Sequence, residues 1–293
     1  METLLKQADL AMYKAKDGGR NALRFFDPAM QTTLDERIAL ETDLRSALAL
    51  GQLMPYYQAQ VDSQGRVIGA EVLLRWKHPV RGMVSPAQFI PLAESTGLIL
   101  PIGHWVLEVA CGQLAAWSKN AVTRKWRLAV NVSARQFRQA EFVNQVRQVL
   151  AKTGADPRRL RIELTESMVL DDVGSILEKM SALKNLGIHF ALDDFGTGHS
   201  SLSYLTRLPL DTLKIDSSFV FNLPDSHNDA VIAQTIILMA RSLGLSVIAE
   251  GVETEAQREF LARHQCYVYQ GYLFSRPLPL AEFEHYAGSC HSA

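Results

Sequence analysis

Short apolar runs alternate with longer amphipathic stretches along most of the chain. The runs predict eight strands, near 56–61, 67–76, 126–132, 159–164, 188–193, 211–215, 245–250 and 267–270. Apolar positions at helical spacing predict intervening helices near 86–94, 102–118, 139–153, 173–186, 227–243 and 254–263. Eight strands that alternate with helices predict an α/β fold, a (β/α)8 barrel of the TIM type.

The first two strands are joined by only a short turn at 62–66. A parallel crossover needs a dozen residues or more, so this turn predicts an antiparallel hairpin. We therefore expect a modified barrel, with one strand running against the others.

The N-terminal region differs from the barrel pattern. A helix is predicted over 33–50, with Leu34, Ile38, Leu44 and Leu48 on its buried face and Gly51 as its stop. Before it, a helix over 4–16 and a short strand over 21–26 are predicted. One helix and one strand cannot form a core, so residues 1–30 are either an N-terminal addition to a barrel domain at 31–293 or the remnant of another domain.

Composition narrows the class of protein. The 293 residues are 47% hydrophobic and 21% charged, which fits one large globular domain. A formal net charge of −1 argues against binding to long nucleic acid. The sequence has three scattered cysteines, no apolar run of membrane-spanning length and no signal-peptide pattern. These features predict a cytoplasmic setting. A longer parent protein could still be tethered to a membrane.

Polar residues occupy the predicted strand ends, where the residues of a barrel converge on one mouth. They are Glu71, Asn131, Glu163, Asp193, Asp194, Lys214, Glu250 and Gln270. Clustered carboxylates repel one another and take up protons unless a cation neutralises them. Oxygen ligands suit Mg²⁺ or Mn²⁺ better than zinc. The pattern predicts a metal-dependent enzyme.

The Asp193–Asp194 pair is the sharpest local signal. Two such carboxylates can bridge two cations roughly 3.5–4 Å apart, as in phosphoryl displacement. The alternative for this pair alone is a helix cap beside a solvated neighbour. Glu71, Asn131 and Glu163 fit a first cation site, although Asn131 could instead be a turn residue.

The remaining polar positions allow several roles. Lys214, kept charged by nearby carboxylates, could hold the attacking water, offset phosphoryl charge, donate a proton or form a structural salt bridge. Glu250 and Glu253 are candidates for a metal ligand or base, and Glu253 could instead cap the next helix. Gln270 could bind a metal water or make a hydrogen bond at the rim.

Two further features adjoin the site. Arg75 could contact a phosphate or pair at the surface, and Asp216 shares a strand face with Lys214. The glycine-rich segment at 195–201 could form a mobile loop that contains His199.

Several ordered motifs together resemble the EAL-domain phosphodiesterases. They are EVLLRW at 71–76, NVS at 131–133, ELTES at 163–167, DDFGTG at 193–198, LKID at 213–216, AEGVET at 249–254 and QGYLF at 270–274. The resemblance covers roughly residues 34–288. It implies a (β/α)8-type barrel with one antiparallel strand that hydrolyses cyclic di-GMP to pGpG with Mg²⁺ or Mn²⁺, two per site.

The resemblance also implies a role for each matched residue. Metal ligands would be Glu71, Asn131, Glu163, Asp193, Asp194 and Glu250, with Lys214, Glu250 and Asp194 in catalysis. Substrate contacts would come from Gln58, Leu73, Arg75, Asp216, Glu253 and Gln270. Glu166 would anchor the glycine-rich loop.

The sequence differs from the family pattern at two positions, and its N-terminal segment resembles a second family. Val72 replaces the alanine of the signature triplet and is expected to point away from the mouth. His199 replaces a tyrosine, which leaves loop closure and dimer coupling open. The segment ADLAMYKAK at 8–16, with GRN at 19–21 and FF at 25–26, resembles the end of a GGDEF diguanylate cyclase domain, which implies a fragment of a tandem protein.

Three hypotheses follow for function. The leading one is an active phosphodiesterase in which two metals activate a water. The alternative is an inactive EAL domain that binds cyclic di-GMP as a receptor, and the third is an unrelated metal- or lysine-dependent barrel enzyme. A homodimer is a further hypothesis.

Overall fold

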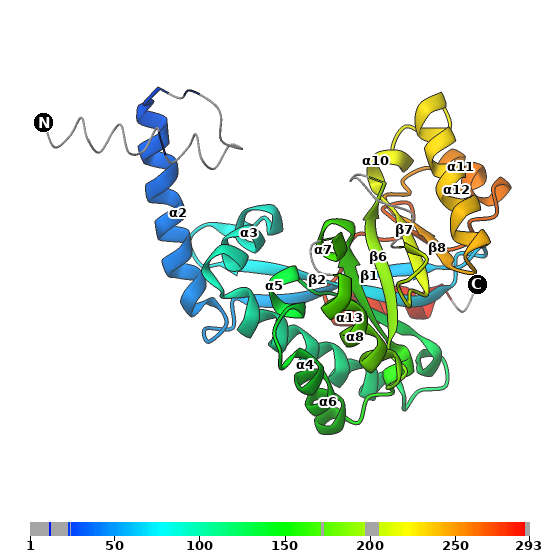
Figure 1. The fold of residues 1–293 in the computed structure, drawn as a ribbon, viewed down its shortest axis with the longest axis horizontal. Helices are drawn as coiled ribbons and strands as arrows, with labels where there is room; N and C mark the ends of the chain where they lie inside the picture. Colours follow the sequence, from blue (N-terminus) through cyan, green and yellow to red (C-terminus); the bar gives the residue numbers. More distant parts are fainter. Residues whose placement is uncertain (1–11, 13–22, 24, 171–172, 197–204, 291–293) are drawn as a thin grey trace, which may run out of the picture.

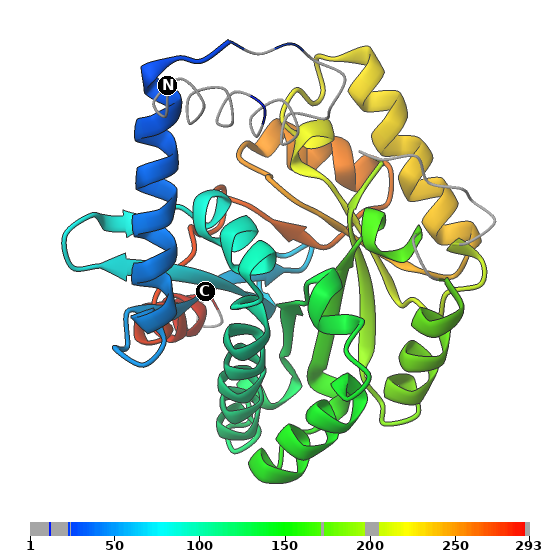
Figure 2. The same ribbon diagram turned by 60° about the vertical axis from the view of Figure 1, so that its left-hand side comes forward.

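A closed ring of eight strands forms the centre of the molecule, with helices around it (Figure 2). The computed structural model describes residues 12, 23, 25–170, 173–196 and 205–290. The strands are β1 (Leu53–Val61), β2 (Val67–His78), β4 (Arg127–Asn131), β5 (Leu160–Thr165), β6 (His189–Phe195), β7 (Thr212–Ile215), β8 (Ser246–Ala249) and β9 (Tyr269–Gln270). The predicted α/β barrel is confirmed.

The ring closes through its first strand. The order is β1-β9-β8-β7-β6-β5-β4-β2, and β1 also pairs with β2. Strand β1 runs antiparallel to both β2 and β9, whereas the other ring pairs are parallel. The expectation of one reversed strand is thus confirmed, and its cause is the short turn after Val61.

Strand β2 is longer than a strand of the barrel needs to be. Its pairing with β1 extends to Leu53↔Trp76, and β3 (Gly82–Val84), absent from our prediction, pairs with its far end. Glu71 therefore lies within β2 and not at its end, contrary to the expectation that it closes a strand. The hairpin carries β2 beyond the mouth of the barrel.

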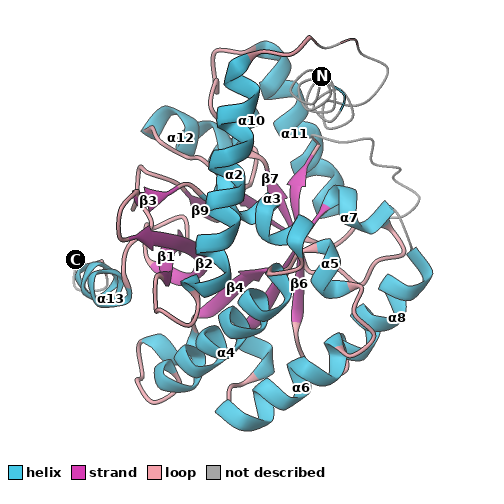
Figure 3. Cartoon of the chain, turned by 90° about the vertical axis from the view of Figure 1, so that its left-hand side faces the viewer, coloured by secondary structure: helices cyan, strands magenta, loops and turns pink. Residues whose placement is uncertain are grey.

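Helices cover the outside of the ring, as Figures 1 and 3 show. They are α3 (Pro86–Thr96), α4 (Ile99–Trp117), α5 (Ala134–Phe137), α6 (Phe142–Thr153), α7 (Glu166–Leu170), α8 (Val173–Lys184), α10 (Ser217–Val220), α11 (His227–Ser242), α12 (Glu255–Arg263) and α13 (Leu280–Ser289). Single 3-10 turns occupy Thr123–Lys125 and Pro157–Arg159. Our prediction missed α5, α7 and α10, which are too short to show helical periodicity, as well as α13.

The apolar core fills the layer between strands and helices. Large buried side chains in this layer are Tyr57, Trp76, Phe89, Phe137, Phe142, Phe190 and Phe283. The interior of the ring is instead rich in buried polar groups, which include Gln58, Gln60, Glu71, Arg161, Glu163, Asp193, Lys214 and Gln270. Alternation along each strand separates these two environments.

Helix α2 (Pro28–Ala47) projects from the barrel (Figure 1). Its C-terminal end packs against the core through the buried residues Leu44 and Ala47. Ile38, predicted to be buried, is 54% exposed, whereas Leu40 of the same helix packs against the core. The helix predicted over 4–16 and the strand over 21–26 fall largely outside the described residues.

Helix α4 corrects one expectation from the sequence. It has 19 residues and a mean hydropathy of 1.3, so by length and composition it could cross a membrane. In this fold α4 packs against β4, α5 and α6, with Ala110 and Cys111 fully buried. Such a helix is weak evidence for a membrane span, because core helices pass the same test.

Candidate functional site

Lys214 lies at the centre of a carboxylate cluster inside the barrel mouth. Its Nζ is 2.7 Å from Glu163 Oε2, 2.7 Å from Glu250 Oε1, 3.1 Å from Asp193 Oδ2 and 3.3 Å from Glu71 Oε2. The side chain is completely buried. One ammonium group is thus shared by four acids from four parts of the chain. Lys214 and these four acids were all predicted site residues, and the structure brings them together.

Strand register explains how these groups meet. In the parallel pair β4–β5, Asn131 stands opposite Glu163, and in the antiparallel pair β1–β2, Gln58 stands opposite Glu71. Lys214 lies on β7 two residues after Thr212, which pairs with Ala191 opposite Glu163, and Glu250 follows β8 directly. Because side chains two apart on a strand share a face, each strand contributes one polar group to this layer.

A strand irregularity accompanies the aspartate pair. The β6–β7 register shifts between Leu192 and Phe195, and Asp194 has a φ of 53°. The Asp194 amide donates to Asp193 Oδ1 at 3.0 Å. Such bulges frequently lie beside functional sites, where they re-aim side chains. Here Asp193 is buried within the barrel while Asp194 is exposed at its rim.

Amide side chains orient the Glu71 carboxylate. Asn131 Nδ2 donates to Glu71 Oε1 at 2.5 Å, and Gln270 Nε2 donates to Glu71 Oε2 at 2.6 Å. Gln270 Nε2 also donates to Gln58 Oε1 at 3.1 Å. Both oxygens of Glu71 are therefore held in fixed directions.

Crowding of like charges perturbs the protonation of the cluster. Burial, with help from Glu71 and Asp193, raises the pKa of Glu163 to about 8 despite the opposing Lys214 charge. Burial also raises the pKa of Glu250 well above its usual value and raises that of Asp194. For Glu71, burial is outweighed by Lys214 and by the amide donors, which lower its pKa. Burial opposes the charged form of Lys214, but the carboxylates of Glu163 and Glu250, with those of Glu71 and Asp193, raise its pKa well above the usual value.

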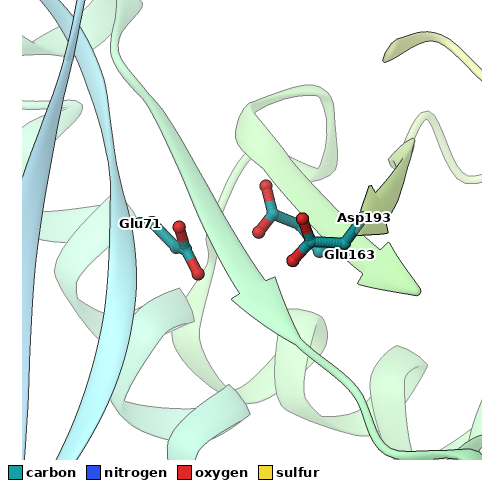
Figure 4. Close-up of side chains that lie close together, drawn as sticks. All are labelled: Glu71, Glu163 and Asp193. Atoms are coloured by element: carbon teal, nitrogen blue, oxygen red, sulfur yellow. The ribbon is translucent and has the colours of Figure 1, made fainter. Parts of the chain in front are cut away.

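Two groups of carboxylates have the composition of a metal site. Glu71, Glu163 and Asp193 offer oxygens within 4.8 Å of one another, as do Asp193, Asp194 and Glu250. Figure 4 shows the first group, with Glu71 on one side and the Glu163 and Asp193 carboxylates facing it. Glu163 Oε1 is buried with no hydrogen-bond partner among the described residues. Hard oxygen donors with one such unpaired atom fit Mg²⁺ or Mn²⁺.

A cavity of about 370 Å³ opens above the cluster. Its walls include four predicted substrate contacts, namely Gln58, Leu73, Glu253 and Gln270, together with Glu71, Asp193 and Glu250. Ser217 and Tyr272, which the sequence reasoning did not single out, line it as well.

The other predicted substrate contacts lie apart from this cavity. Arg75 Nη1 donates to Leu74 O at 3.0 Å, and Arg75 Cζ lies over the Tyr56 ring, 5.8 Å from its centroid. Arg75 also borders a neighbouring apolar cavity of about 320 Å³. Asp216 is the N-cap of α10 and accepts from the Ser218 amide at 3.0 Å. Glu253 does not cap the following helix, because Thr254 does so in a capping box with Gln257.

Glu166 lies beside the start of the glycine-rich segment. Its Oε2 accepts a hydrogen bond from the Gly196 amide at 3.0 Å, and its side chain is buried. His199 and residues 197–204 lie outside the described residues.

Sequence reasoning missed two buried polar residues below the cluster, Gln60 and Arg161. Gln60 follows Gln58 at a spacing of two, and Arg161 precedes Glu163 at the same spacing. Polar side chains repeated every second residue in an apolar strand mark its inward face, which is the signal that could have found them.

Comparisons with known proteins agree with this geometry. A family model described as "EAL domain" matches residues 41–277. The bifunctional diguanylate cyclase/cyclic di-GMP phosphodiesterase MucR of Pseudomonas aeruginosa is 46% identical over 94% of this chain, and the cyclic di-GMP phosphodiesterase NbdA of the same organism is 42% identical over 97%. The chain spans only 40% and 36% of the length of these two proteins.

One similar solved structure is described as a PaMucR phosphodiesterase in complex with c-di-GMP. It has a TM-score of 0.81 and 46% identity, over 84% of this chain and 99% of that one. At this identity the likeness extends beyond the fold to the sequence of the barrel.

Proposed function

This chain belongs to the EAL domain family, and from that membership we propose that its barrel is a phosphodiesterase that hydrolyses cyclic di-GMP to linear pGpG. The observation that carries the proposal is the cluster of four acids around the buried Lys214. Relatives named as cyclic di-GMP phosphodiesterases support the choice of substrate.

We propose that Glu71, Asn131, Glu163, Asp193, Asp194 and Glu250 hold two divalent cations, Mg²⁺ or Mn²⁺. When bound, these cations would polarise the phosphodiester and lower the pKa of a water. The metal-free arrangement supports this, because a single Lys214 ammonium does not balance the carboxylates of Glu71, Glu163, Asp193 and Glu250. Burial raises the pKa values of Glu163 and Glu250, which fits a site whose carboxylates are under-compensated without a cation.

The chain's own residues would serve the reaction as follows. Hydrolysis adds a water oxygen to phosphorus and breaks the bond to the ribose 3′ oxygen, which leaves with a proton. Lys214 Nζ would hold the attacking water and offset charge on the phosphoryl oxygens. A carboxylate oxygen of Glu250, the acid held 2.7 Å from Lys214 Nζ, would take the proton of that water. Asp194, at the rim, would complete the second cation site.

Substrate binding is assigned to the walls of the mouth. Gln58, Leu73, Glu253 and Gln270 border the cavity above the cluster, which suits a dinucleotide laid across the opening. Arg75 and Asp216 flank this region and would contact the substrate from outside the cavity. Glu166, bonded to the Gly196 amide, would anchor the glycine-rich loop.

The deciding experiment is hydrolysis of cyclic di-GMP with Mg²⁺ or Mn²⁺, followed by chromatography for pGpG. We expect metal-dependent pGpG from the parent protein and none from Glu71→Ala. Glu108→Ala, which removes an acid from the outer helix α4, is the matched control and should keep full activity.

The same experiment separates the alternative functions. Tight binding of cyclic di-GMP with no product would replace this proposal with a receptor that binds without cleavage. Neither binding nor cleavage would favour a different substrate for the barrel.

The organisation around the barrel is also a proposal. We propose that residues 1–30 are the tail of a GGDEF-like domain and that 31–293 form the phosphodiesterase. The name of MucR, a bifunctional diguanylate cyclase/cyclic di-GMP phosphodiesterase, supports a cyclase domain next to such a barrel. A cytoplasmic location stays a prediction. The homodimer hypothesis is tested by light scattering, and a monomer at every working concentration would contradict it.

A further inference from the structure

A continuous line of hydrogen bonds crosses the barrel interior from Arg161 to Glu71. Arg161 Nη1 donates to Gln60 Oε1 at 3.1 Å, and Gln60 Nε2 donates to Gln270 Oε1 at 3.0 Å. Gln270 Nε2 then donates to Glu71 Oε2 at 2.6 Å and to Gln58 Oε1 at 3.1 Å. These five side chains are 2–7% exposed, so water has little access to any of them.

The two ends of this line have opposite and fixed chemistry. A guanidinium is always a donor, whereas an ionised carboxylate is always an acceptor. A glutamine amide can face either way, because its oxygen and nitrogen occupy similar positions. Between Arg161 and Glu71, however, only one orientation of Gln60 and Gln270 gives every contact a donor and an acceptor.

Reversal of this order would damage the Glu71 site directly. If Gln60 turned over, its Oε1 would face Gln270 Oε1, and Gln270 would have to turn as well. Its oxygen would then face both the Glu71 carboxylate and Gln58 Oε1. Glu71 would lose a 2.6 Å donor and gain a repulsive neighbour. In a buried site each such acceptor–acceptor contact is costly.

We propose that Arg161 is a positioning residue for the metal site, which acts by fixing the orientation of Gln60 and Gln270 and thereby the donor to Glu71. Register supports this route, because Gln60 stands directly opposite Gln270 in the β1–β9 pair. Buried arginine is costly, and Arg161 Nε has no hydrogen-bond partner among the described side chains and backbone. Burial of this charge is explained if its N–H donors fix which way the Gln60 and Gln270 amides face.

The inference rests on Glu71 as a metal ligand, which is part of the proposed function. Its test is therefore Mn²⁺ affinity without substrate, measured by calorimetry on the whole chain. Outer hydrogen-bond partners of metal ligands typically change metal affinity 10–100-fold when removed. We expect Arg161→Met, which removes the donor, to weaken Mn²⁺ binding about tenfold. Arg161→Lys keeps a donor and should stay within about threefold of the parent.

A matched control and a rescue separate polarity from packing. Arg159→Met makes the same change two residues earlier, where the guanidinium contacts Lys125 O outside this line, and should leave Mn²⁺ affinity unchanged. Gln60→Lys in the Arg161→Met background supplies a donor-only group one step closer to Gln270. This double variant should recover most of the lost affinity.

A second single variant tests the same logic without any change at Arg161. Gln60→Glu still accepts from Arg161 but cannot donate to Gln270 Oε1, so Gln270 must turn its nitrogen away from Glu71. We expect a larger loss of Mn²⁺ affinity than for Arg161→Met, with circular dichroism showing a folded barrel. If Arg161→Met fails to fold, the Gln60→Glu and Arg161→Lys measurements decide the question.

The outcomes are distinct for this inference and for the proposed function. Equal Mn²⁺ affinity for Gln60→Glu and the parent, or equal weakening by Arg161→Met and Arg161→Lys, would overturn the positioning role. A parent protein that binds Mn²⁺ but does not cleave cyclic di-GMP would overturn the phosphodiesterase proposal and leave the positioning role standing.

Discussion

The inner and outer faces of the strand ring use the same alternating strands for opposite purposes. On the outer face, Tyr57, Trp117, Trp126 and Phe283 pack with ring centroids 5.2–6.1 Å apart, and nearly every atom is removed from water. On the inner face, four carboxylates crowd around one lysine. The packed aromatic rings of the outer layer stabilise the fold. The crowded carboxylates of the inner layer lower the stability and are the groups proposed to bind cations.

The largest effect is expected from removal of Lys214. Lys214→Met leaves three buried acids and the partly buried Glu250 without a counter-charge, so we expect the free energy of unfolding to fall by about 3–5 kcal/mol. Cleavage of cyclic di-GMP should fall below detection. Urea denaturation in EDTA measures the first effect, and added Mn²⁺ should restore part of the lost stability. Parent-like stability in EDTA would show that the cluster is neutral without its lysine.

The converse change removes an aromatic side chain from the outer layer. Phe283→Ala deletes a fully buried ring that contacts Tyr57, Trp117 and Trp126. We expect a loss of about 3–5 kcal/mol in the free energy of unfolding. The rate per folded molecule should change less than twofold, since no residue of the mouth is touched. A drop in the rate of folded protein would mean that the two faces are coupled.

Metal binding should reduce the cost of the inner layer. At a Mn²⁺ concentration 100 times the dissociation constant, a single site adds about 2.7 kcal/mol to the free energy of unfolding. Thermal unfolding with and without EDTA measures this gain. Glu71→Gln should remove most of it, while Glu108→Ala should keep it. A gain that survives in Glu71→Gln would place the bound ion elsewhere.

The smallest expected effect for a single step in conditions is the change in stability of the metal-free protein with each pH unit. Burial raises the pKa of Glu163 to about 8 from an ordinary value of 4.5, so the folded state holds a proton that the unfolded state releases. Stability should therefore be full below about pH 4.5 and fall as pH rises towards 8, by at most about 1.4 kcal/mol per pH unit for this group. Denaturation in EDTA at several pH values measures the slope.

Glu163→Gln is the matched control for that slope. It removes the titrating group and should flatten the decline, so that the variant is more stable than the parent above pH 8. A slope of the same size in both proteins would assign the decline to the raised pKa of Glu250 or Asp194 instead.

The sequence predicted the fold well because strand and helix patterns alternate with little interruption. All eight ring strands lie within a few residues of their expected positions. The short turn before Val67 correctly predicted the reversed strand. The strand β3 and the four-residue helices α5 and α10 escaped prediction, since such short elements depend on tertiary contacts. Ile38 was misplaced because helical spacing alone does not reveal which apolar positions of a helix reach the core.

The site was predictable only as far as strand positions report it. Asn131, Glu163, Asp193 and Lys214 stand on or near strand ends, and the barrel architecture brings such positions together. Glu71 was recognised although the reason was wrong, because β2 continues for seven residues past it to His78. Gln60 and Arg161 were missed because their importance lies in pairing across the ring, which no local pattern records.

The closure of the ring by β1 has a consequence for how the protein is made. Gln60 and Gln270 are bonded although 210 residues separate them, so the ring cannot close until nearly the whole domain has left the ribosome. Contacts this distant in sequence slow folding. Until β9 is made, the β1–β2 hairpin has an unpaired edge on β1. Because Gln270 also completes the surroundings of Glu71, the nascent chain would complete the proposed cation site only at the last stage of synthesis. An incomplete translation product would therefore carry most of the acids yet have no finished site.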